Sequence, residues 1–199
     1  IAKIKVIDEI ISLKFNNIKI NNILSALATL KTLNLKIETT KNFFENYQAL
    51  EGRGKILKIS SKKTKFNLID ESYNANPLSV KEAIKDLSKI KTKKNIKKYL
   101  LLGDMLELGE KSKKYHQRIS KFINSAKIDK FFVYGQNAIN TYKSVKKAKQ
   151  GNILQEDKDF YQLVSPILRK NDYLMIKGSN ATGLNVIVKR LIKRSKHAL

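Results

Sequence analysis

From residue 55 onward, short apolar runs alternate with longer segments in which apolar residues recur every three or four positions. The short runs are typical of buried strands, and the periodic segments are typical of amphipathic helices. We expect strands over residues 55–60, 66–70, 99–102, 130–134, 152–154 and 173–176. We expect helices over residues 77–90, 112–126, from about 136, 157–168 and 182–195. This alternation predicts an α/β fold with a mostly parallel, doubly wound, Rossmann-like sheet.

The first fifty residues follow a different pattern. Short apolar runs within residues 1–17 predict strands or a hairpin, and residues 21–34 predict a helix. Thr39 or Thr40 is expected to cap a second short helix. A Gly-Arg-Gly turn follows at residues 52–54 and marks a boundary. We therefore expect one domain over residues 1–50 and a second over residues 51–199.

Polar loops follow several of the predicted strands. In a doubly wound sheet the strand-to-helix loops share one edge, where such folds bind their ligands. The first loop begins with Asp70 and Glu71 and ends with Asn76 and Pro77. A helix cap explains Asn76 and Pro77 completely. Two adjacent carboxylates at a strand end, however, suit ribose hydroxyls or a cation.

Three further loops follow other predicted strands. A capped turn and a ligand contact explain Asp104, in the loop from Gly103 to Gly109, equally well. The loop over residues 135–137 is interpreted as structural. In the loop that begins at Lys177, an ammonium, the Ser179 hydroxyl and a helix N-terminus suit a carboxylate or a phosphate.

Composition excludes several kinds of chemistry. The chain has 199 residues, no cysteine and two histidines, so disulfides, a thiolate metal site and a histidine-rich metal site are excluded. His116 has no evident partner, and we expect it to lie on a helix, either at the surface or partly buried; His197 falls in a tail expected to fray. No apolar run reaches the roughly 20 residues of a membrane span. Because the chain starts with Ile1 rather than methionine, we expect it to be a fragment or a processed product.

The formal net charge of +24 suggests a nucleic-acid partner as one alternative. Nearly all of the positive charge comes from lysine, with clusters at residues 62–65, 91–98 and 143–149. We find no arrangement of aromatic residues or arginines of the kind that reads nucleic acid. A solvated lysine-rich surface is therefore the preferred interpretation, with a nucleic-acid-binding module as the alternative. A stand-alone nucleotide-binding enzyme is a weaker third hypothesis, because no phosphate-binding loop motif is present.

Taken together, these loops resemble the C-terminal domain of the Mur ligases. The resemblance rests on three runs in the family's order: Asp70–Pro77 (DESYNANP), Leu102–Gly109 (LGDMLELG) with His116, and Ile176–Ser179 (IKGS). The MurF type is the most similar. Gly52 and Arg53 match the motif that joins the family's central and C-terminal domains. Residues 22–28 resemble the helix that ends its central ATPase domain, so residues 1–50 would be the end of that domain.

The resemblance implies a reaction. It is the ATP-dependent addition of D-alanyl-D-alanine to UDP-N-acetylmuramoyl-tripeptide, through an acyl phosphate, in cytoplasmic peptidoglycan precursor synthesis. ATP and Mg²⁺ would be held mainly by upstream domains, so this chain alone would be inactive and would hold no metal. We expect a monomer whose partners are these small molecules, without a specific nucleic acid or a membrane.

The resemblance also implies roles for individual residues. Arg53, Asp70, Glu71 and Asn22 would lie on the nucleotide side. The dipeptide side would be lined by Asn74, Asn76, Asp104, Lys177 and Ser179, with Lys177 paired to the dipeptide carboxylate. The sequence departs from the family in two places. Ile18 and Lys19 stand where the family usually has histidine and asparagine, and Glu71 stands where it more often has aspartate.

Overall fold

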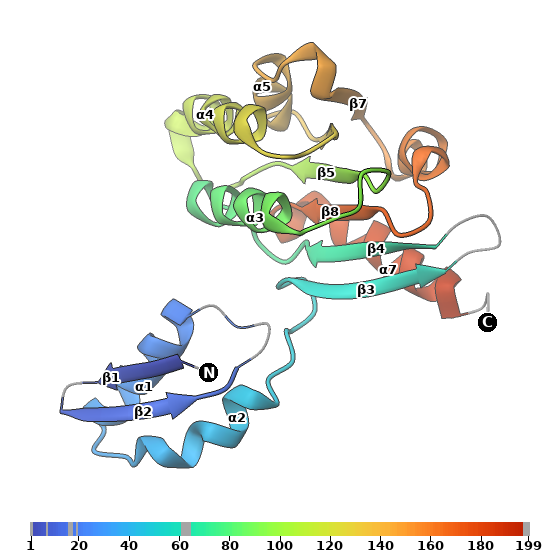
Figure 1. Ribbon diagram of the computed structural model, residues 1–199. Helices are drawn as coiled ribbons and strands as arrows, with labels where there is room; N and C mark the ends of the chain where they lie inside the picture. Colours follow the sequence, from blue (N-terminus) through green and yellow to red (C-terminus); the bar gives the residue numbers. More distant parts are fainter. Residues whose placement is uncertain (1, 7, 16–17, 19, 61–64, 197–199) are drawn as a thin grey trace. The chain divides into compact units, whose positions relative to one another are not determined.

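The computed structural model describes residues 2–6, 8–15, 18, 20–60 and 65–196. The chain divides into two compact units, Ile1–Leu50 and Glu51–Leu199. Figure 1 shows both units, and each is described separately below. Among the residues described, no helix is long and apolar enough to cross a membrane.

The first unit is a hairpin covered by helices. Its strands, β1 (Ala2–Val6) and β2 (Glu9–Leu13), pair antiparallel. They are followed by α1 (Ile20–Thr32), the 3₁₀ turn η1 (Ile37–Thr40) and α2 (Lys41–Glu45). A small apolar core is shared by these elements: Ile4, Val6, Ile11, Leu13, Ile23, Leu27, Ile37 and Phe44.

The expected threonine cap is wrong. Thr40 occupies the N-cap position of α2 but its side chain makes no capping hydrogen bond. Its hydroxyl donates instead to the Ile37 carbonyl at 2.6 Å, and the Thr39 hydroxyl donates to the Lys36 carbonyl at 2.8 Å. Both hydroxyls therefore act within the preceding 3₁₀ turn rather than at the start of the helix.

The second unit contains a six-stranded sheet. Its strands are β3 (Lys55–Ser60), β4 (Lys65–Glu71), β5 (Lys98–Gly103), β6 (Lys130–Tyr134), β7 (Gln150–Leu154) and β8 (Tyr173–Lys177). The spatial order is β3-β4-β8-β5-β6-β7, and only β3, at one edge, runs antiparallel to its neighbour. In Figure 1 the arrowheads of β4, β8 and β5 point the same way. The expected mostly parallel sheet is confirmed.

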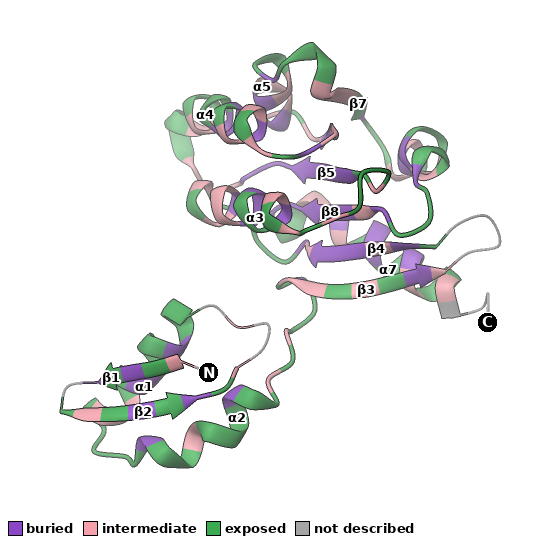
Figure 2. Ribbon diagram, in the orientation of Figure 1, coloured by how far each residue is buried: buried purple, intermediate pink, exposed green. Residues whose placement is uncertain are grey.

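Helices cover both faces of this sheet. One face packs against α3 (Pro77–Lys89), α4 (Ser112–Ser125) and α5 (Ala138–Lys143). The other packs against α7 (Leu184–Lys196) and the segment from α6 (Asp157–Asp159) through η4 (Phe160–Val164) to η5 (Ser165–Ile167). Alternate residues of β5 reach opposite faces: Leu100 and Leu102 belong to the first core, Tyr99 and Leu101 to the second. In Figure 2 the central strands are mostly purple, which marks buried residues, and the helices carry much of the green, which marks exposed residues.

Two helix predictions need correction. Residues 157–168 do not form one regular α-helix: a π-helical turn, η4, follows α6, and η5 begins before Pro166, which has no amide hydrogen to donate. The last helix starts at Leu184 rather than Thr182, because Gly183 has φ +80° and follows the 3₁₀ turn η6 (Asn180–Thr182). In α4 the buried face is formed by His116, Ile119, Ser120 and Ile123. Tyr115 and Phe122 are only half-buried.

Candidate functional site at the carboxyl edge of the sheet

The strand-to-helix loops meet at one edge of the sheet. Strand β8 lies between β4 and β5, so Lys177 pairs in register with Glu71 on one side and with Leu102 on the other. Gly103 at the end of β5 in turn pairs with Tyr134 at the end of β6. The loops after these strands therefore share a rim, as parallel topology predicts.

A buried ion pair lies at the centre of this rim. The Lys177 ammonium donates to Glu71 Oε2 at 3.1 Å and to the Asn74 carbonyl at 3.0 Å. The Lys177 side chain is 2% exposed and that of Glu71 is 20% exposed. A ligand approaching here would first meet the carboxylate, because the ammonium is enclosed beneath the loop. The enclosed charge needs these partners, since a buried unpaired ammonium is costly.

Asp70 faces inward. Its Oδ2 accepts from the Gly52 amide at 2.9 Å, and its Oδ1 accepts from the Ser72 amide at 3.1 Å and the Ser72 hydroxyl at 2.6 Å. Asp70 is only 4% exposed. The amide of Gly54 donates to the Asp70 carbonyl at 2.7 Å. Asp70 thus ties the end of β4 to the turn over residues 52–54.

That turn carries Arg53 against an aromatic ring. The Arg53 guanidinium carbon lies 4.2 Å from the centroid of the Tyr73 ring, a cation–π contact. Gly52 has φ +73°, and a β-carbon there would lie 2.7 Å from the Tyr73 β-carbon, so only glycine fits. The Tyr73 amide also donates to the Gly52 carbonyl at 3.2 Å. Arg53 is exposed, and its backbone is closely fixed by these contacts.

The two asparagines of the loop bond locally. Asn76 is the N-cap of α3: its Oδ1 accepts from the Ser79 amide at 2.8 Å, and its own amide donates to Ser79 Oγ at 3.1 Å. The capping prediction for Asn76 and Pro77 is confirmed. Asn74 Oδ1 accepts from the Ala75 amide at 2.7 Å. Both asparagines are exposed, so their amide groups still border the rim.

Ser179 connects three loops. Its hydroxyl donates to the Ala75 carbonyl at 3.3 Å and accepts from the Leu106 amide at 3.0 Å. Its amide donates to the Asp104 carbonyl at 3.0 Å. The residue is 7% exposed, so these bonds occupy it inside the rim rather than at its surface.

Asp104 connects the rim to the start of α5. Its Oδ1 accepts from the Ala138 amide at 2.7 Å, and its Oδ2 accepts from Asn137 Nδ2 at 3.4 Å. A β-carbon on Gly135 would lie 2.7 Å from the Asp104 carboxyl carbon. Both contacts run to the segment that follows β6, so they are neither a cap of the turn that carries Asp104 nor a ligand contact, the two explanations that the sequence leaves open. The structural interpretation of residues 135–137 agrees with them.

The expectation of a surface or partly buried position for His116 is wrong. His116 is fully buried, its Nε2 accepts from the Met105 amide at 3.0 Å, and Nδ1 lies 2.9 Å from the Ser112 carbonyl. A carbonyl partner places the proton on Nδ1, which leaves Nε2 as an acceptor and the ring neutral. Burial lowers the pKa of His116, partly offset by the Ser112 carbonyl and by Asp104. The ring therefore holds the loop after β5 in place.

The remaining expected residues lie elsewhere. Asn22 is exposed on α1, in the first unit. Lys19, Lys62, Lys63 and His197 fall outside the described residues. Across the part of the chain that the structure describes, no three His, Asp or Glu side chains gather in a way that would hold a metal ion. The sequence does not identify Tyr73 as a residue of the site, because nothing in the linear pattern places its ring beside Arg53.

Fold and rim together define a class: a doubly wound α/β domain with one antiparallel edge strand and polar loops at the carboxyl edge. The family described as "Mur ligase, glutamate ligase domain" matches residues 52–180. The chain therefore belongs to the Mur ligase family.

Curated relatives agree with this assignment. UDP-N-acetylmuramoyl-tripeptide–D-alanyl-D-alanine ligase of Buchnera aphidicola subsp. Acyrthosiphon pisum is 37% identical over 130 residues, which is 65% of this chain and 27% of that protein. The ligase of the same name from Bacillus subtilis is 33% identical over 147 residues, covering 72% of this chain and 32% of that protein. The chain thus spans about a third or less of these relatives.

Solved structures share the fold. MurF ligase from Thermotoga maritima, in complex with ADP, superposes with a TM-score of 0.69 at 21% identity, over 89% of this chain and 38% of that one. A UDP-N-acetylmuramoylalanyl-D-glutamyl-2,6-diaminopimelate–D-alanyl-D-alanyl ligase from Acinetobacter baumannii gives a TM-score of 0.74 at 19% identity, over 96% and 41%.

Proposed function

We propose that this chain is the C-terminal part of a MurF-type ligase, which adds D-alanyl-D-alanine to UDP-N-acetylmuramoyl-tripeptide at the expense of ATP. The central observation is that Arg53, Glu71 and Lys177, which are distant in sequence, are connected by contacts through one loop at one rim. Support comes from the family match and from two relatives that bear this ligase's name. Residues 1–50 would be the end of the ATP-binding domain.

The reaction requires that the phosphate charge is neutralised and that the dipeptide amine is held near the acyl carbon. ATP phosphorylates the tripeptide carboxylate, and the dipeptide amine then attacks the acyl carbon, forms the amide and releases phosphate. Arg53, exposed and held against Tyr73, would contact the nucleotide phosphates. Mg²⁺ would supply further charge neutralisation, held by residues outside this chain. Asn22 is proposed for the nucleotide side as well.

The rim residues divide into contacts and supports. Glu71 and Asn74 border the surface and are proposed to meet the ribose and the dipeptide, respectively. Lys177 would pair with the dipeptide carboxylate, which requires that carboxylate to join or replace Glu71 as its partner. Asp70, Asn76, Asp104 and Ser179, which the family resemblance implies as direct contacts, are instead proposed to position the loops, because Asp70, Asp104 and Ser179 are buried and Asn76 caps α3.

The proposed setting follows from the substrates. UDP-linked precursors and ATP are cytoplasmic small molecules, so we place this step in the cytoplasm. We also propose that the protein is a monomer. The chain contains no phosphate-binding loop motif, so it should not turn over by itself.

The test is phosphate release from ATP by the full-length protein that contains this chain, with UDP-N-acetylmuramoyl-tripeptide present. Release should depend on D-alanyl-D-alanine. Lys177→Ala should raise the KM for the dipeptide at least tenfold, as expected for loss of a charged hydrogen bond. Lys127→Ala, an exposed lysine at the opposite edge, is the matched control and should leave the KM unchanged. Release that ignores the dipeptide would overturn the proposal.

A further inference from the structure

Lysine clusters that are separate in sequence come together at the opposite edge of the sheet. The loops that enter β5, β6, β7 and β8 cover residues 90–97, 126–129, 144–149 and 168–172. The amino ends of parallel strands share an edge, so these loops lie in one row, here called the amino edge. Lys65, at the start of β4, continues the row.

Hydrogen bonds connect successive members of this row. The Asn171 amide donates to the Lys65 carbonyl at 2.9 Å, and the Tyr173 amide donates to the Lys97 carbonyl at 2.9 Å. The Asp129 amide donates to the Lys98 carbonyl at 2.9 Å. Farther along, the Lys149 ammonium donates to the Ile123 carbonyl, the last turn of α4, at 2.8 Å. The amino edge is therefore continuous across the sheet from β4 to β7.

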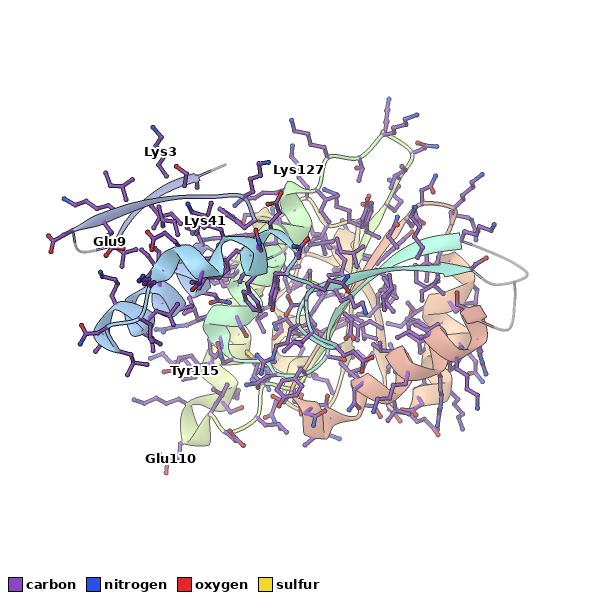
Figure 3. All side chains as sticks on the ribbon, turned by 90° about the horizontal axis from the view of Figure 1, so that it is seen from below. Lys3, Glu9, Lys41, Glu110, Tyr115 and Lys127 are labelled. Carbon is purple, nitrogen blue, oxygen red and sulfur yellow. The ribbon has the colours of Figure 1, made fainter. Side chains whose placement is uncertain are left out.

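Charge on the two edges is opposite in sign. The four amino-edge loops contain ten cations and two acids, Asp129 and Asp172. Nine of the cations are exposed: Lys91, Lys93, Lys94, Lys97, Lys127, Lys146, Lys147, Arg169 and Lys170. The loops that leave the parallel strands, residues 72–76, 104–111, 135–137, 155–156 and 178–183, contain one lysine and four acids. Figure 3 shows Lys127 and Glu110 at opposite ends of α4.

Local structure explains few of these cations. Asp172 is fully buried and accepts from the Lys97 and Arg169 amides, both at 2.8 Å. Asp129 accepts from the Lys98 amide at 2.9 Å and pairs with one lysine, Lys97, at 3.0 Å. Lys98 and Lys149 donate to carbonyls at the ends of α3 and α4, where cations are favoured. The other exposed lysines form an outward-facing excess of positive charge.

Against the sequence-based expectation of no membrane partner, we propose that the amino edge is a docking surface for an anionic membrane, held by lipid phosphates and carboxylates. A plane of headgroups requires only a cluster of flexible positive charges close to it. The four loops contain no aromatic residue and one arginine, so they offer neither the stacking nor the forked hydrogen bonds by which proteins read nucleic acid. Docking at this edge leaves the carboxyl-edge site open to its substrates, and the inference holds whether or not the proposed ligase activity is correct.

The experiment is co-sedimentation of the 199-residue chain with phosphatidylcholine vesicles that do or do not contain phosphatidylserine, at low and at physiological salt. One variant replaces Lys93, Lys94, Lys146 and Lys147 with glutamine. The matched control replaces Lys111, Lys113, Lys114 and Lys158 with glutamine. These lysines are also exposed, at or near the starts of α4 and α6, and their replacement removes the same amount of charge. Both sets are surface residues, and a thermal melt checks that each variant is folded.

The wild-type chain should bind only the phosphatidylserine vesicles, more weakly as salt rises. Each lysine close to an anionic surface contributes about fivefold, so the amino-edge variant should lose roughly two to three orders of magnitude in partitioning. The control should lose less than about tenfold. Equal loss in both variants, no binding by the wild type, or tighter binding to duplex DNA that the amino-edge substitutions abolish would each overturn the proposal.

Discussion

The ammonium of Lys177 and the carboxylate of Glu71, 106 positions apart in sequence, lie 3.1 Å apart at the ends of adjacent parallel strands. Because β8 is the last strand along the chain yet lies between β4 and β5, this pair connects the two halves of the sheet. The same ammonium donates to the Asn74 carbonyl, so the pair also determines the path of the loop that carries Tyr73.

Breaking this pair should be costly, and the cost should depend on which partner remains. Glu71→Ala leaves an enclosed ammonium without its carboxylate and should lower the free energy of unfolding by about 2–4 kcal/mol. Glu71→Gln keeps an oxygen acceptor and should cost about 1 kcal/mol. Urea denaturation followed by circular dichroism measures both. Equal, small losses would mean that the ammonium finds other solvation in the folded chain.

Asp70→Asn should disrupt the turn beneath Arg53. The carboxylate accepts three hydrogen bonds through two oxygens, whereas an amide has one oxygen and directs an NH₂ group at another donor. We expect a loss of about 2–3 kcal/mol in the free energy of unfolding. Faster hydrogen exchange of the Gly52 amide should accompany it. Asp86→Asn, on α3, is the control. An unchanged exchange rate of the Gly52 amide in Asp70→Asn would contradict the role assigned to Asp70.

The Arg53–Tyr73 contact should show coupling that depends on the ring rather than on the hydroxyl. Tyr73→Phe should retain it, whereas Tyr73→Leu should remove about 0.5–1 kcal/mol, the usual size for an exposed cation–π pair. A double-mutant cycle with Arg53→Gln isolates this energy from other effects of each substitution. A coupling energy near zero would show that Arg53 is held by its backbone alone.

Acid should destabilise the fold through His116. Burial lowers its pKa from the usual 6.5, so the unfolded chain takes up a proton at a higher pH than the folded chain does. The contribution of the neutral histidine to the free energy of unfolding is therefore complete above about pH 6.5. It is progressively lost as the pH falls toward the lowered pKa of the folded state.

A pH series of urea unfolding curves tests this. The wild type should lose stability between pH 7 and pH 5 more steeply than His116→Gln, which keeps polar groups but cannot titrate there. Parallel curves for the two proteins would contradict the buried neutral ring.

Local pattern was sufficient for most elements. Asn76 and Pro77 marked the start of α3 because a cap and a proline at the first helical position act within a few residues. The buried stripe of that helix, Val80, Ala83, Ile84 and Leu87, recurs at the three- and four-residue spacing that the sequence alone shows. The pattern failed at Phe160–Val164, where a π-helical turn replaces regular helix.

The sequence by itself determined the alternation of strands and helices, and with it the rule that polar loops gather at one edge. Only the tertiary structure decided that β8 inserts between β4 and β5, that Asp70 turns inward while Glu71 borders the surface, and that separate lysine clusters form one basic edge. The reason is physical: helix and strand periodicities are set by neighbouring residues, whereas strand order and side-chain burial depend on pairings between segments as much as a hundred residues apart.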